Sequence, residues 1–176
     1  MRRPAAEQSA SATMTVSFIA FIGKQNEPIF SFTPEEDAAE ALHLQMIAHS
    51  ALDIVEERVE DAKAARMEDA KAATTSLEPF LGQLFTVDDY RVYGFLSNTK
   101  IKAIVIFNQF SDYAADSPRV TATGTSGQSL RDFVLSLYSI YVKDMQNPLQ
   151  KIEDVCTSER FRSKILQCVR AYQAKK

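Results

Sequence analysis

The sequence predicts an α+β domain in which a five-stranded, mostly antiparallel sheet lies between helices, in the order ββαβββαα. Runs of β-branched and aromatic residues alternate with turn-forming residues, as in hairpins. Other segments carry apolar residues at helical spacing. A third observation suggests that helices cover both faces of the sheet. The run "KIKAIVIF" is apolar on both faces, which is typical of a central strand covered on both sides.

The first third of the chain predicts a hairpin followed by a long helix. "TVSFIAFIGK" and "PIFSF" have the composition of strands, and the intervening "KQNEP" favours a turn. Thr33, followed by Pro34 and Glu36, has the pattern of a helix start. The helix then carries one apolar stripe, formed by Ala41, Leu44, Ile47, Ala48, Ala51, Leu52, Val55 and Val59.

A short repeat follows this stripe. "EDAKAARM" is followed at once by "EDAKAATT", both composed of helix-favouring residues without a wide apolar stripe. Isolated helices that bury nothing are only marginally stable. We therefore expect residues at about 60–76 to form a charged insertion, either a solvent-exposed helical extension or a partly ordered segment.

The remaining segments complete the sheet and add two helices. Strands are expected in "FLGQLFTV", "YRVYGFLS" and "KIKAIVIF", with a two-residue turn at Asn98–Thr99 because Asn tolerates positive φ. Ser129, with Asp132 three residues later, is expected to cap a helix that ends before Asn147–Pro148. A last amphipathic helix should begin near Ser158. One face of the sheet would then pack the long helix, and the other the two terminal helices.

Composition narrows the class of protein. A chain of 176 residues suits one domain, expected at 14–176 behind a disordered tail at 1–13, for which a mitochondrial presequence is the alternative. The net charge of −3 predicts no nucleic-acid partner. No run is long enough to span a bilayer. Two cysteines favour a reducing, intracellular compartment over a disulfide scaffold.

No catalytic, cofactor or metal motif is found. His43 and His49 point to different sides of a helix, and Cys156 and Cys168 lack zinc-finger spacing. His49 and Asp53 are four residues apart, as a base and the group that orients it would be, but such a pair is also an ordinary helix contact. "TGTSGQS" lacks the lysine of a phosphate-binding loop. No cofactor and no enzymatic activity are therefore predicted.

Three separated motifs resemble the sedlin family of small TRAPP complex subunits, and its sedlin-like paralogue branch in particular. They are "MIAHSALDIVEERV", "FLGQLFTVDDYRVYGFLSNTKIKAIVI" and "SLYSIYVKDMQNP". The resemblance implies a longin-like (profilin-like) fold. It also implies a non-catalytic adaptor in a tethering complex that promotes nucleotide exchange on Rab-type GTPases in ER–Golgi and endosomal vesicle traffic. Such an adaptor would be cytoplasmic and peripheral to Golgi and ER–Golgi membranes. The repeats, Leu149 after the "NP" and the tail before Met14 depart from the family pattern.

Partners are then expected to be other small TRAPP subunits, with Rab-type GTPases reached only indirectly. Asp53 stands as a charge within the apolar run "ALDIV", which suggests either a contact residue or a paired structural carboxylate. The hypothetical partner interface comprises His49, Asp53, Glu56, Glu57, Tyr138 and Asn147. The alternatives are a longin domain regulating a SNARE or a coat, although a SNARE would need a heptad segment and an anchor beyond Lys176, and a small hydrolase using His49 and Asp53.

Overall fold

The computed structural model describes residues 13–34, 38–68, 78–110, 125–146 and 158–174. Its element order confirms the predicted ββαβββαα arrangement and the longin-like α+β fold. The strands are β1 (Thr13–Ile22), β2 (Pro28–Phe32), β3 (Phe80–Val87), β4 (Tyr90–Leu96) and β5 (Lys102–Phe110). The helices are α1 (Ala38–Glu68), α2 (Thr125–Met145) and α3 (Glu159–Gln173).

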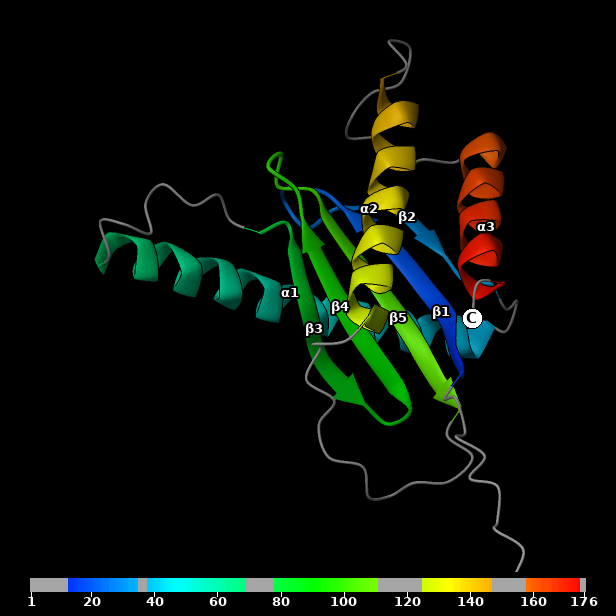
Figure 1. Ribbon diagram of the computed structural model, residues 1–176, viewed down its shortest axis with the longest axis horizontal. Helices are drawn as coiled ribbons and strands as arrows, with labels where there is room; N and C mark the ends of the chain where they lie inside the picture. Colours follow the sequence, from blue (N-terminus) through cyan, green and yellow to red (C-terminus); the bar gives the residue numbers. More distant parts are fainter. Residues whose placement is uncertain (1–12, 35–37, 69–77, 111–124, 147–157, 175–176) are drawn as a thin grey trace, which may run out of the picture.

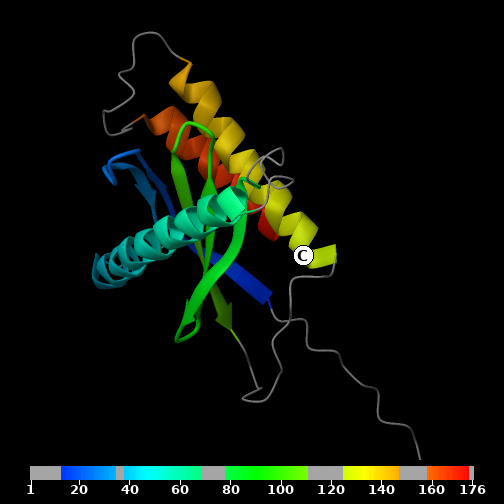
Figure 2. The ribbon, with the colours of Figure 1, turned by 90° about the vertical axis from the view of Figure 1, so that its left-hand side faces the viewer.

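The five strands form one antiparallel sheet in the order β2-β1-β5-β4-β3, with β5 at its centre. As predicted, β5 is buried on both sides. Ala103, Val105 and Phe107 belong to one core cluster, whereas Ile104 and Ile106 belong to the other. Figures 1 and 2 show the resulting three layers, with α1 on one face and α2 and α3 on the other.

The face under α2 and α3 carries an aromatic core. The ring of Phe161 on α3 lies edge-on to Phe30, with centroids 4.7 Å apart, and tilts against Phe21 at 6.2 Å. Tyr172 of α3 stacks on Phe133 of α2 at 4.2 Å. These contacts join both helices to each other and to the strands, so this face is closed by two helices together.

Among the described helices, α1 is the one that packs against the opposite face. Six residues of the predicted stripe are buried there, over Phe18, Ala20, Ile104 and Ile106 of the sheet: Leu44, Ile47, Ala48, Ala51, Leu52 and Val55. The other two, Ala41 and Val59, are only partly buried. Val55 is the last fully buried residue among the helix residues whose burial is described. Beyond it α1 runs past β3 to Glu68 (Figure 1), so the first "EDAKAARM" copy is helical and the described side chains in it are exposed.

An irregularity in β1 sets which side chains reach each face. Val16 pairs with Phe107 and Phe18 pairs with Ile106, so Ser17 is an extra residue in the ladder. Simple alternation would place Val16 and Phe18 on the same side of the sheet. The extra residue instead lets Val16 join the core under α2 and α3 while Phe18 joins the core under α1.

The hairpin turns agree with prediction in place but not always in geometry. The β1–β2 turn is at the expected "KQNEP", where Asn26 takes φ 65°. The β4–β5 turn is centred on Asn98–Thr99, but the positive φ of 64° falls on Lys100, so the predicted two-residue geometry is wrong. The hydroxyl of Ser97 accepts a bond from the Ile101 N–H at 3.0 Å, which stabilises this longer turn.

The predicted cap of α2 is also wrong, because the helix already begins at Thr125 and Ser129 lies inside it. Weak helix formers are tolerated in a first turn, where the N–H groups have no intrahelical partner to lose. The predicted start of α3 is confirmed, since the Ser158 hydroxyl accepts a bond from the Phe161 N–H. Several predicted features lie outside the described residues: Glu36, Asn147, Cys156, most of the N-terminal tail and the second repeat after Glu68.

The two edge strands differ. β3 has two register shifts and a positive φ of 73° at Gly82. The guanidinium of Arg58, on α1, donates to the carbonyls of Leu81 and Gln83 at 2.6 and 2.8 Å and reaches that of Leu84 at 3.4 Å. Bulges and an arginine that occupies strand carbonyls protect an edge against pairing with another chain. β2, at the other edge, is a five-residue strand.

Candidate partner interface

The side of α1 that faces away from the sheet changes character along its length. Its residues recur at helical spacing and are exposed: Leu42, Met46, His49, Asp53 and Glu57. Leu42 is 61% and Met46 65% exposed, and the only other large apolar side chain exposed among the described residues is Leu135 of α2. We call this side the outer face of α1. It is apolar toward the start of the helix and acidic from Asp53 onward.

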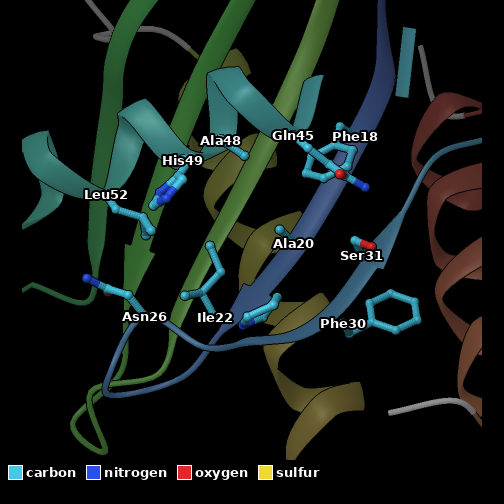
Figure 3. A pocket seen from close by; sticks show the side chains of 11 residues that line it. Phe18, Ala20, Ile22, Asn26, Phe30, Ser31, Gln45, Ala48, His49 and Leu52 are labelled. Carbon is cyan, nitrogen blue, oxygen red and sulfur yellow. The ribbon is translucent and has the colours of Figure 1, made fainter. Parts of the chain in front are cut away.

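A groove runs between α1 and the β1–β2 hairpin, with a volume of about 380 Å³ (Figure 3). We call it the hairpin groove. Its floor and walls are apolar and its rim is polar, and the residues that form it are Phe18, Ala20, Ile22, Asn26, Pro28, Phe30, Ser31, Gln45, Ala48, His49 and Leu52. His49 and Gln45 therefore separate the groove from the exposed apolar residues of the outer face.

The groove has a simple physical origin. A sheet of five strands is about 19 Å across, whereas one helix is about 10 Å in diameter. Two helices lie on one face, but α1 crosses the other face alone (Figures 1 and 2). The groove thus lies along the edge of the core under α1, where Phe18, Ala20 and Ile22 of β1 border it while remaining buried against the helix.

Glu56 lies at the end of this groove and is held by a polar network. The ammonium of Lys102, at the start of β5, donates to the Glu56 carboxylate at 3.0 Å and also to the Asn26 side-chain oxygen. The Asn26 amide donates to the same carboxylate at 3.0 Å. The Lys102 side chain is 7% exposed, whereas that of Glu56 is 51% exposed. The hydrogen bonds from Asn26 and Lys102, together with the Lys102 charge, hold the pKa of Glu56 below its usual value.

His49 and Asp53 are both exposed, and no hydrogen bond joins them in the part of the chain that the structure describes. Asp53 likewise has no ion-pair partner among the described residues, so the geometry gives no support to the paired structural carboxylate considered from the sequence. His49 lines the hairpin groove instead. The pair therefore does not have the hydrogen bond that a base and its orienting group require.

The predicted interface residues fall on two sides of the molecule. His49, Asp53, Glu56 and Glu57 lie together on α1. Tyr138 lies on α2, half-buried, with its ring 4.9 Å from that of Phe95 and 6.2 Å from that of Tyr141. Asn147 lies outside the described residues. One continuous surface can contain the four α1 residues, but not Tyr138 as well.

The described residues provide neither a cluster of metal ligands nor a helix suited to crossing a membrane. They contain no group of three His, Cys, Asp or Glu side chains placed to hold a metal ion. No described helix combines the length and apolar character that crossing a membrane would need. The outer face of α1 and the adjoining hairpin groove combine exposed apolar side chains with an apolar groove on one side of the molecule.

Comparison with known proteins agrees with the resemblance carried by the three motifs. The sequence model described as sedlin matches residues 21–171, which is most of the chain. The chain belongs to the sedlin family. Residues 47–56 of the first motif contribute to both the buried and the exposed side of α1. Ala48, Leu52 and Val55 are part of the core, whereas His49 and Asp53 are exposed.

Curated relatives match along nearly their whole length. The trafficking protein particle complex subunit 2-like protein of Dictyostelium discoideum is 28% identical over 153 residues, covering 86% of this chain and 94% of the relative. Its namesake in Rattus norvegicus is 26% identical over 144 residues, covering 81% and 88%. The probable trafficking protein particle complex subunit 2 of Caenorhabditis elegans is 24% identical, covering 84% and 89%.

Sequence reasoning missed the apolar half of this surface. Leu42 and Met46 lie away from the buried stripe on the helix, and this position could have indicated that they face solvent. The groove gave no such signal, because it depends on how α1 crosses the β1–β2 hairpin. The role of Arg58 was also missed, since its carbonyl partners lie 23 to 26 residues away.

Proposed function

We propose that this chain is an adaptor subunit of a TRAPP-type tethering complex, and that it joins its neighbours through the outer face of α1. The observation that carries the proposal is the position of the first family motif. It forms the core-facing stripe of α1 and also supplies His49 and Asp53 to the exposed side. Exposed apolar residues beside such charges are typical of surfaces that bind other proteins.

In this proposal the chain performs no chemistry itself. Family membership and the names of its relatives support a place in a trafficking particle. No serine or cysteine among the described residues is hydrogen-bonded to a histidine, and burial raises the pKa of the Cys168 thiol, which reduces its reactive thiolate. The chain would position other small subunits, and these would act together on a Rab-type GTPase at Golgi or ER–Golgi membranes.

Tyr138, on α2, is a second proposed contact, as is Asn147, which lies outside the described residues. Because Tyr138 packs against Phe95, its ring is partly committed to the fold. We therefore assign the main contact to α1 and a supporting one to Tyr138.

The test is co-expression of the tagged chain with the other small subunits of the particle from the same organism, followed by size-exclusion chromatography. The wild-type chain should elute with them in near-equal amounts. Asp53→Tyr should reduce its incorporation at least tenfold while the isolated variant keeps its circular dichroism spectrum. Asp132→Tyr, on the exposed side of α2, is the matched control and should assemble normally. A wild-type chain that elutes alone would contradict the proposal.

A further inference from the structure

The hairpin groove and the acidic part of α1 lie next to each other, and together they indicate which kind of segment can bind there. We propose that the groove receives a large apolar side chain from a neighbouring subunit, and that a lysine or arginine near that side chain pairs with Asp53 and Glu57. This inference rests on the proposed function and goes beyond it, because it states the chemistry of the segment that binds.

The apolar side chain is inferred from the lining. Phe18, Ala20 and Ile22 of β1, with Ala48 and Leu52 of α1, surround the space. A volume of about 380 Å³ is at the lower end of ligand pockets, which suits a side chain with part of its backbone better than an extended cofactor. Polar groups of Asn26, Ser31 and His49 stand at the rim, where they can bond to the backbone of the entering segment (Figure 3).

The basic residue is inferred from charge. Asp53 and Glu57 are exposed and have no ion-pair partner within the described part of the chain. Two cations of the neighbouring elements are already used, since Arg58 donates to the β3 carbonyls and Lys102 to Glu56. No described cation pairs with Asp53 or Glu57. An approaching positive charge would therefore be attracted to these two carboxylates.

The two requirements fix a spacing. Glu57 is eight residues beyond His49, which is about 12 Å along a helix. The segment we infer thus carries a bulky apolar residue followed within about 12 Å by Lys or Arg. Leu42 and Met46 provide an apolar shoulder on the opposite side of His49.

The experiment uses the complete chain and an assembly of the other small subunits prepared without it, with affinity measured by calorimetry at low and high salt. Gln45→Trp places a bulky ring at the groove mouth from an exposed position. It should weaken binding at least tenfold. Gln167→Trp, the same change on the exposed side of α3, should bind as the wild type does.

The charge requirement is tested in parallel. Asp53→Asn combined with Glu57→Gln should weaken binding several-fold at about 0.05 M salt. At about 0.5 M salt the same double variant should weaken binding by much less, since salt screens exposed charges. Asp132→Asn should have no effect. A photo-cross-linker at Ser31 should attach to a peptide of a neighbouring subunit that contains the apolar and basic residues described.

The outcomes separate the two proposals. If the wild-type chain binds no assembly, the proposed function fails and this inference fails with it. If the chain binds but Gln45→Trp binds equally well, only the groove inference is overturned. A cross-linked peptide without an apolar residue would also overturn it. So would a titration with oleate in which oleate binds the groove and the affinity for the assembly does not fall.

Discussion

On one face of the sheet α2 and α3 lie side by side and close an aromatic core, whereas on the other face α1 lies alone beside an open groove. Both faces contribute fully buried residues from the same central strand, β5. They differ in what remains exposed, because one helix cannot cover the width that two can. The comparison suggests that the face under α2 and α3 mainly stabilises the domain, and that the α1 face also binds partners.

The largest effect is expected from the closed face. Phe161→Ala removes a completely buried ring that contacts Phe21 and Phe30. Such truncations cost about 3–5 kcal/mol of unfolding free energy. Chemical denaturation should show this loss, while Leu135→Ala on the same face, at an exposed position, should change stability by less than about 0.5 kcal/mol. A loss below about 0.5 kcal/mol for Phe161→Ala, which is the range of a surface change, would contradict the assignment of this face as the main core.

A smaller effect is expected at the β3 edge. Arg58→Met keeps much of the aliphatic stem but removes the donors to the β3 carbonyls, and should cost about 1–2 kcal/mol. Because the edge becomes free to pair, light scattering on heating should also rise. Arg160→Met, at an exposed position of α3, is the control. Equal behaviour of the two variants would show that Arg58 does not protect the edge.

The network at Glu56 predicts a pH dependence. Since the pKa of Glu56 is lowered in the folded chain, its stabilisation is present above the ordinary carboxyl pKa and is lost as pH falls through the lowered value. Glu56→Gln should therefore cost up to about 1 kcal/mol near neutral pH, limited by solvent screening of the half-exposed carboxylate.

The difference in unfolding free energy between wild type and Glu56→Gln should then shrink toward zero as pH falls below the lowered pKa. Urea denaturation at several pH values measures it. Glu57→Gln, which removes an exposed carboxylate without a described ion pair, should show little change at any pH. A difference in unfolding free energy that stays constant from neutral to acid pH would mean that the charge of the Glu56 carboxylate does not stabilise its network with Asn26 and Lys102.

The smallest effect on folding is expected on the outer face of α1. Leu42→Ala combined with Met46→Ala removes exposed side chains and should change stability by less than about 0.5 kcal/mol. The same double variant should weaken binding to the assembled small subunits. Destabilisation of more than 2 kcal/mol would indicate that these residues support the fold instead.

Most of the fold could be predicted because its elements have local patterns. The α1 stripe, the two-faced β5 and the Ser158 cap each depend on residues close together in the chain. The positive φ at Lys100 and the early start of α2 were missed, since both depend on the local competition between similar backbone conformations. The groove depends on how α1 crosses the β1–β2 hairpin, and the Asn26–Glu56–Lys102 network joins residues 30 to 76 positions apart. No local pattern encodes either feature.

The central claim is that partners bind the α1 face, and hydroxyl-radical footprinting of the chain, free and in the assembled complex, tests it most directly. Met46 and Leu42 are exposed and should be oxidised in the free chain. We expect both to become protected on assembly, while Leu135 on α2 reacts as before. Protection of Leu135 with Met46 still fully reactive in the complex would contradict the account.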